Sequence, residues 1–139
     1  MEESNYLGNL IGQDDSPLIP TPHSGEWLAW LGGIKDESAR LFQDVTLPSD
    51  GPAFLRYYYQ IDSEKNSCNQ DWMRLLVGAT VLDTWGLCSA ANTQDWVADS
   101  VDLSAYTGQS ITIMFEVVTD SAQDTSSFFI DDVSLVRNP

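Results

Sequence analysis

A two-residue hydrophobic period runs from about residue 26 to the end of the chain, and it limits the possible fold more than any other feature. Successive side chains of a strand point to opposite faces, so this alternation is typical of strands with one buried face. The clearest case is AFLRYYYQI at 53–61. One parity of this segment, which we expect to face the core, holds Leu55, Tyr57, Tyr59 and Ile61. No stretch keeps a helical period over three turns.

Turn residues such as Gly, Pro, Asp and Ser separate the apolar runs, as they do between strands. Strands are predicted at 26–33, 39–47, 53–61, 72–85 (a hairpin turning near Gly78), 95–103, 110–118 and 128–135. Seven or eight antiparallel strands with long polar loops predict an all-β fold, a two-sheet antiparallel β-sandwich of the jelly-roll type. We expect residues 22–139 to form this one domain. Residues 1–21 are either a leader segment or a first strand with its loop.

The charge is strongly acidic, with six Lys and Arg against twenty-one Asp and Glu and a net charge of −15. Nucleic acid and anionic membranes are therefore unsuitable partners, because binding phosphates requires Lys and Arg. No apolar run approaches the roughly 20 residues of a membrane-spanning helix. The first ten residues lack the basic and apolar regions of a signal peptide. The chain is thus either cytosolic or a domain cut from a longer secreted protein.

The two cysteines favour the secreted alternative. Cys68 and Cys88 each lie ten residues from Gly78, so a hairpin turning there places them opposite each other at its open end. Residues that face each other across two strands are close to disulfide distance. Two unrelated buried thiols are the alternative. We predict a disulfide, which indicates an oxidising, extracellular location.

The segment FFIDDVSL at 128–135 holds two adjacent carboxylates inside an apparent core strand. By parity Asp131 shares a face with Phe129, Val133 and Leu135. An unpaired carboxylate on a core face costs several kcal/mol or loses its charge. Compensation must come from a cation, from backbone donors or from a turn that breaks the alternation.

The order of HSGEWLAWLGG, ARLFQDVTLP, FLRYYYQI, VDLSAYTGQ and FFIDDVSL resembles one family over residues 22–136. It is the MAM-like jelly-roll module of bacterial secreted multidomain proteins, including the tails of immune-inhibitor-A-type metallopeptidases. The resemblance implies an accessory or adhesion module rather than a catalyst. The cysteines that open and close animal MAM domains are missing, so their disulfide scheme and dimer contacts do not carry over.

Such modules often hold a structural cation where the first strand meets the last. We therefore expect Ca²⁺ at Asp131 or Asp132, with Glu26 and Glu116 as further ligands, because calcium takes six to eight oxygens. The alternative is that one Asp accepts backbone N–H bonds or caps a bulge while the other faces water. The loop acids Asp120 and Asp124 form a second candidate cluster, better explained as solvated turn residues.

Sites for catalysis find little support in the sequence. The single histidine, His23, stands beside Ser24 in a Pro-flanked loop, and no G-x-S-x-G elbow occurs. With so many acids, some carboxylate pair falls within glycosidase spacing by chance. No phosphate or dinucleotide fingerprint is present. We predict that the chain is not an enzyme, and an independent hydrolase is the second alternative function.

Aromatic residues give the better functional signal. They are Trp27, Trp30, Trp72, Trp85, Trp96 and the run Tyr57, Tyr58 and Tyr59. Parity places Phe54 and Tyr58 opposite the core beside Arg56, where the three could form a ligand-binding surface that stacks on sugar rings. The simpler interpretation is that a sheet, a loop or a neighbouring domain covers them.

These observations together predict a non-catalytic binding or adhesion accessory module of a larger secreted or surface protein, stabilised by calcium. A carbohydrate-binding module that uses exposed aromatics is the first alternative. The expected partner is a glycan or a protein surface, with no nucleic acid and no membrane insertion. Acidic edge strands should resist pairing, so we expect a monomer in isolation.

Overall fold

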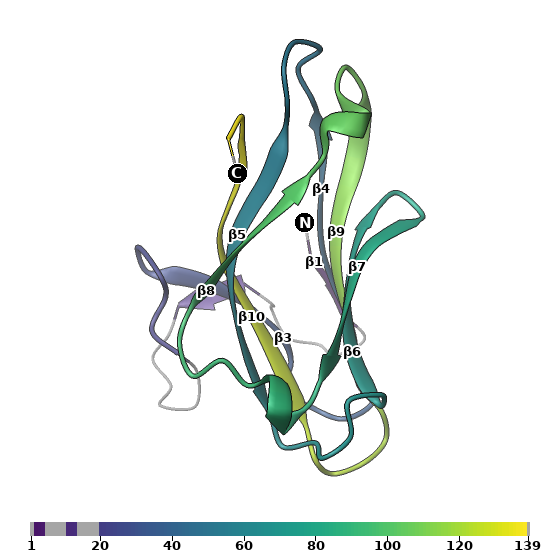
Figure 1. Cartoon of the computed structure of the whole chain (residues 1–139). Helices are drawn as coiled ribbons and strands as arrows, with labels where there is room; N and C mark the ends of the chain where they lie inside the picture. The colour runs from purple at the N-terminus through teal and green to yellow at the C-terminus, as the bar shows by residue number, and fades with distance from the viewer. Residues whose placement is uncertain (1, 5–10, 14–19, 139) are drawn as a thin grey trace.

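Two antiparallel sheets of five strands each make up the fold in the computed structural model, which describes residues 2–4, 11–13 and 20–138 (Figure 1). Sheet A has the spatial order β1 (Glu2–Ser4), β4 (Ser38–Thr46), β9 (Ser110–Val118), β6 (Asp71–Val77) and β7 (Thr80–Leu87). Sheet B has the order β2 (Ile11–Gln13), β3 (Trp27–Gly32), β10 (Ser126–Val136), β5 (Phe54–Ser63) and β8 (Val97–Asp102). Two short 3₁₀ turns follow β7 and β8, namely η1 (Ser89–Ala91) and η2 (Ser104–Tyr106).

The connections between strands give the sandwich its jelly-roll winding. From β3 onward every connection passes from one sheet to the other, except the hairpin that joins β6 to β7. The chain thus wraps around a single core, and the predicted two-sheet jelly roll is confirmed. No helix in the described part of the chain is long and apolar enough to cross a membrane.

Two short strands near the N-terminus extend the sheets. Residues 2–4 pair with β4 at the edge of sheet A, and residues 11–13 pair with β3 at the edge of sheet B. The rest of the predicted leader segment up to residue 19 lies outside the described residues.

The β6–β7 hairpin forms where the sequence predicts it. Val77 pairs with Thr80, and Gly78 takes a φ of 58° in the turn, a conformation that suits glycine. Cys68 and Cys88 form the predicted disulfide just beyond the open end of this hairpin, with their Cα atoms 4.8 Å apart.

Strand β5 alternates as predicted and supplies much of the core. Leu55, Tyr57 and Ile61 are buried between the sheets, and Tyr57 is 0% exposed. The Tyr57 ring meets Phe115 of sheet A edge-on, with ring centroids 4.9 Å apart. Edge-to-face contact is favourable for aromatic rings, so this pair ties the two sheets together.

The first half of the last strand places its carboxylate outside the core. Phe128 and Ile130 face inward, while Phe129 and Asp131 lie on the outer face of sheet B, where Asp131 pairs with Tyr58. The prediction that Asp131 shares the core face is therefore wrong. Phe129 and Asp131 do share one face, as predicted. That face is the outer one, because Phe129 is an apolar residue buried on the outer side of sheet B.

A bulge then reverses the facing of the second half of the strand. The pairing with β5 shifts register between Asp131 and Ser134, and Asp132 takes a φ of 50°. Strand β10 thus has one residue more than β5 between these pairs, and this extra residue breaks the alternation of its side chains. Val133 and Leu135, which parity had grouped with Asp131, consequently point between the sheets.

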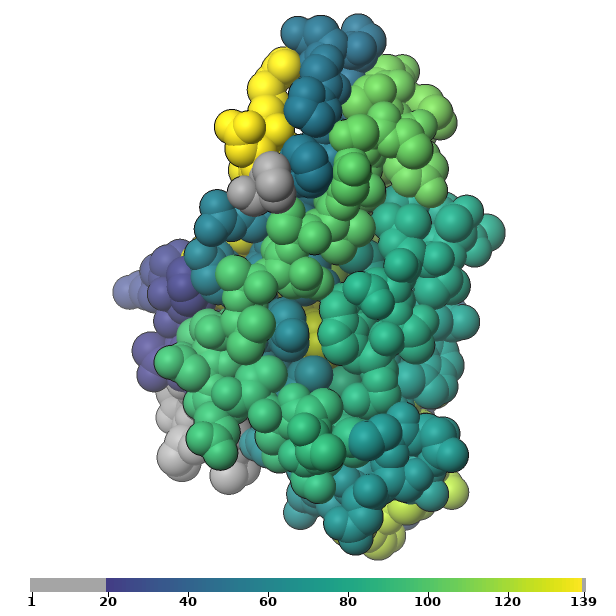
Figure 2. Space-filling view, viewed as in Figure 1, coloured from purple at the N-terminus to yellow at the C-terminus, as the bar shows by residue number. Residues whose placement is uncertain are grey.

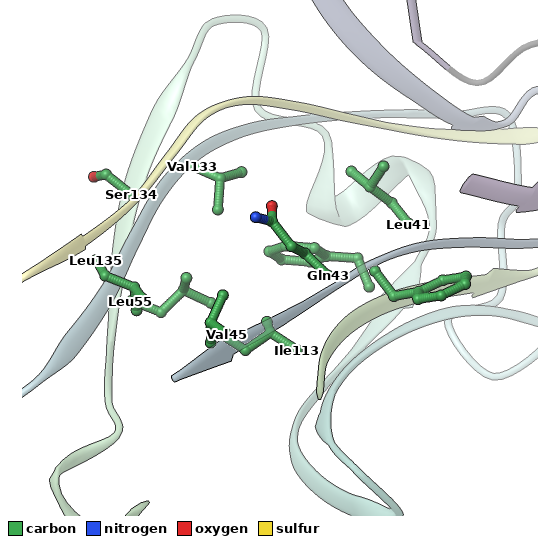
Figure 3. A pocket seen from close by; sticks show the side chains of 10 residues that line it. Leu41, Gln43, Val45, Leu55, Ile113, Val133, Ser134 and Leu135 are labelled. Carbon is green, nitrogen blue, oxygen red and sulfur yellow. The ribbon is translucent and has the colours of Figure 1, made fainter. Parts of the chain in front are cut away.

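Val133 and Leu135 line an open apolar cleft at one end of the sandwich, between β10 and β4 (Figure 3). The cleft has a volume of about 390 Å³, and its walls include Val45, Leu55 and Ile113. No charged side chain is among its lining residues.

Candidate functional site

The two adjacent aspartates bind the loop that precedes β3. The Oδ2 atom of Asp131 accepts hydrogen bonds from the backbone N–H groups of His23 and Ser24, at 2.8 and 3.3 Å. Asp132 accepts from the Ser24 hydroxyl and from Nδ1 of His23, both at 2.6 Å. The donors of the His23–Ser24 loop and the bulge therefore explain how two carboxylates are accommodated within this strand.

The same contacts bear on the hydrolase alternative. Ser24 and His23 both bond to Asp132, so the serine donates to the acid and not to the histidine. A nucleophile–base pair needs the bond between serine and histidine. The bonds from Ser24 and then from His23 hold the pKa of Asp132 below its usual value, so this carboxylate is ionised and acts as an acceptor.

The predicted ligand-binding residues share the outer face of sheet B. Tyr58 is half-buried because the His23 ring stacks on it, with centroids 3.7 Å apart and planes 17° apart. Trp96 meets His23 edge-on at 6.1 Å. Phe54 is half-buried, whereas Arg56 is exposed. One face of Tyr58 is thus occupied by a loop, and a role for this group in ligand binding stays a prediction.

The structure separates the predicted calcium ligands. Glu26 is exposed just before β3, but Glu116 lies on β9 of sheet A, where it bonds to Arg40 and Arg74 at 2.7 Å each. Within the described residues no three His, Cys, Asp or Glu side chains are grouped to hold a metal ion. Calcium at Asp131 or Asp132 stays a prediction, and a cation there would have to displace the donors of the His23–Ser24 loop.

The second acidic cluster is also divided. Asp120 accepts a hydrogen bond from the Lys65 ammonium at 2.5 Å, whereas Asp124 is exposed in the same loop. Asp120 is therefore part of an ion pair and not a solvated turn residue.

Replacing Glu116 by glutamine should change how stability depends on pH. Burial raises the pKa of Glu116, but the bonds from Arg40 and Arg74 outweigh it and hold the pKa below the ordinary 4.5. A carboxylate with a lowered folded pKa stabilises the fold above its unfolded pKa, and this contribution disappears as pH falls through the folded value. We expect E116Q to lose about 2 kcal/mol at pH 7 and less at pH 3. Urea denaturation at both pH values measures this, with D62N on the exposed surface as the control. A loss of equal size at both pH values would contradict the ionic role.

A second candidate site lies where β7 and β8, the last strands of the two sheets, face each other across the sandwich. On β7, Asp83 and Trp85 pair with the inward residues Leu75 and Met73, so both point between the sheets. On β8, Asp99 pairs with the inward Tyr57 and does the same. We call the opening between β7 and β8 the furrow and its two edges the lips. Asp83 lies on the β7 lip and Asp99 on the β8 lip, so each lip carries a carboxylate.

Aromatic rings form the interior of the furrow. Tyr59 stacks parallel to Phe128 with centroids 5.5 Å apart, and Trp85 lies 6.1 Å from Tyr59 at an angle of 52°. Tyr59 and Trp85 are only half-buried. Figure 2 shows the furrow between green β8 and teal β7, with atoms in the colours of β5 and β10 at its base.

The carboxylates of the furrow are held in place by donors from the fold. The Tyr57 hydroxyl donates to Oδ2 of Asp99 at 2.7 Å, and the backbone N–H of Ser100 donates to Oδ1 at 2.8 Å. Burial and then the bond to Asp99 raise the pKa of Tyr57, so its hydroxyl keeps its proton. Asp83 accepts from the N–H of Thr84 at 2.9 Å. An ionised carboxylate has about four acceptor positions, so both groups can accept further hydrogen bonds.

Sequence reasoning missed this furrow, although a signal for it exists. Asp99 stands between Val97 and Val101 and shares their parity, which is the apolar face of the predicted strand at 95–103. Asp83 likewise shares the parity of Trp85. A carboxylate at an inward position marks a site where the core opens to solvent. The sequence alone does not tell which strands lie at the edges of the sheets.

The fold and the furrow define a class of protein, the jelly-roll β-sandwich with an aromatic and acidic opening between its sheets. No known protein-family profile matches the chain. It is similar to a segment of the pre-pro-metalloprotease PrtV of Vibrio cholerae serotype O1, in strains M66-2 and El Tor Inaba N16961. Identity is 28% over 126 residues, which cover 82% of this chain but only 13% of PrtV. The MAM-like assignment stays a prediction.

Among solved structures, the carbohydrate-binding module TmCBM61 in complex with β-1,4-galactotriose has a similar fold. The TM-score is 0.62 at 21% sequence identity, over 99% of this chain and 88% of the other. This likeness establishes a common β-sandwich architecture.

Proposed function

We propose that this chain is a non-catalytic glycan-binding module of a larger secreted protein, and that sugar binds in the furrow between β7 and β8. The observation that carries the proposal is that the half-buried rings of Tyr59 and Trp85 lie in the same opening as the inward Asp83 and Asp99. Apolar faces of sugar rings stack on aromatic rings, and their hydroxyls need fixed acceptors. The apolar cleft between β10 and β4 has no charged group to offer a sugar.

Two further observations support this function. The fold is shared with a module whose structure was solved with a galactose trisaccharide. The similarity to part of PrtV suits a domain attached to a secreted enzyme, and the Cys68–Cys88 disulfide suits an oxidising compartment. Because Asp99 bonds to the buried Tyr57 hydroxyl, it is better suited to fixing a sugar hydroxyl than to moving a proton.

Titration with soluble polysaccharides, including β-1,4-galactan, tests the proposal by isothermal calorimetry and tryptophan fluorescence. We expect W85L, which keeps an apolar side chain but removes the flat ring, to weaken binding about tenfold or more. W27L is the matched control, because Trp27 is 55% exposed at the start of β3 in the other sheet from β7.

Circular dichroism of both variants checks that the fold is retained. Failure of every polysaccharide to bind would refute the glycan function. Binding that is lost in W27L and kept in W85L would move the site away from the furrow.

A further inference from the structure

The furrow carries two carboxylates, Asp83 on β7 and Asp99 on β8. None of the ion pairs between described side chains includes Asp83 or Asp99. The donors that Asp83 and Asp99 do have are two backbone amides and one tyrosine hydroxyl, all uncharged. Two carboxylates on opposite lips thus leave a space in which a cation would be favoured and an anion repelled.

The aromatic rings act in the same direction. The faces of Tyr59 and Trp85 carry the negative part of the ring quadrupole, which attracts ammonium groups. Burial and then the charges of Asp99 and Asp83 raise the pKa of Tyr59, which agrees with both carboxylates acting on this ring. Rings and acids together resemble the aromatic cages that hold ammonium ligands.

We propose that the furrow selects glycans whose sugars carry free, protonated amino groups, in preference to N-acetylated sugars, and that it excludes uronic acids. The inference rests on the glycan function proposed above and names its ligand class. Every hexose offers an apolar face and hydroxyls to the furrow. A free amino group adds a charge-assisted bond to Asp83 or Asp99, an acetamide removes that charge, and a uronate adds repulsion.

Hexamers of glucosamine, N-acetylglucosamine and galacturonate, compared by calorimetry at pH 6 and low salt, test this selection. We expect glucosamine to bind about tenfold more tightly than the N-acetylated hexamer, and galacturonate not to bind. In D83N the preference should fall to about twofold, because one lip loses its charge. Asp83 is chosen over Asp99 because the latter bonds to a core tyrosine.

The general acidity of the protein must be separated from the charge of the furrow. D62N removes the same charge from an exposed position on β5 and should keep the tenfold preference. Equal affinity for the glucosamine and N-acetylated hexamers, or a preference that D83N and D62N lower equally, would overturn the inference. If W85L still weakens binding in that case, the glycan function stands and only the selection fails. If none of these hexamers binds and no polysaccharide does, both proposals fail.

Discussion

Replacing Lys65 by methionine should lower the melting temperature by about 10 °C or more. Lys65 is 2% exposed, and its ammonium lies 2.5 Å from Oδ1 of Asp120 and 4.0 Å from Oδ1 of Asp71. Asp71 is 0% exposed. Without the lysine, the Asp71 carboxylate stays buried and loses this cation, which is the costly way to break a buried ion pair.

A second substitution separates charge from packing in this cluster. In K65M/D71N the asparagine can still accept the hydrogen bond that Asp120 N–H donates to Asp71 Oδ1 at 2.8 Å, but it carries no charge. We expect this double variant to recover most of the lost melting temperature, measured by calorimetry. A double variant as unstable as K65M would show that the loss comes from packing.

Alkaline pH provides an independent readout of the same cluster. The hydrogen bond to Asp120 holds the pKa of Lys65 above its ordinary 10.5. A raised folded pKa stabilises the fold below the unfolded pKa, and the contribution is lost as pH rises through the folded value. Wild type should therefore lose stability above about pH 10.5, more steeply than K65M does.

Removing the disulfide should cost about 3 kcal/mol of unfolding free energy. The bond between Cys68 and Cys88 closes a loop of sequence separation 20, which restricts the unfolded chain. The backbone at Cys68 also lies close against β7, because a Cβ at Gly86 would be 2.1 Å from the Cys68 carbonyl oxygen. Position 86 therefore has no room for any side chain larger than the hydrogen of glycine.

Urea denaturation of C68S/C88S, with and without a reductant, measures the effect. The reductant should lower the stability of the wild type to that of the double variant and leave the double variant unchanged. A double variant as stable as the oxidised wild type would contradict the stabilising role.

The local part of this fold could be predicted from its sequence. The hairpin at Gly78 and the inward face of β5 follow from turn residues and parity alone, and the disulfide follows from the hairpin. These features depend on neighbours in the chain, which a sequence states directly.

Features that depend on the arrangement of sheets were harder to predict. The face of Asp131 was assigned wrongly because Phe129, an apolar residue, is buried on the outer side of sheet B. The bulge at Asp132 then reversed the alternation, which parity cannot anticipate. The furrow was not predicted because Asp83 and Asp99 come to lie in one opening only through the order of the strands, which places β7 and β8 last in their sheets.

The most direct test of a sugar site in the furrow is a map of where a bound glycan changes the protein. A glucosamine hexamer titrated into ¹⁵N-labelled protein should shift the amide signals of Asp83 and Asp99 and the indole N–H signal of Trp85. Signals of the His23 loop and of the cleft between β4 and β10 should stay in place. Shifts confined to either of those regions would contradict binding in the furrow, and so would the absence of any shift with this hexamer and with every polysaccharide tested.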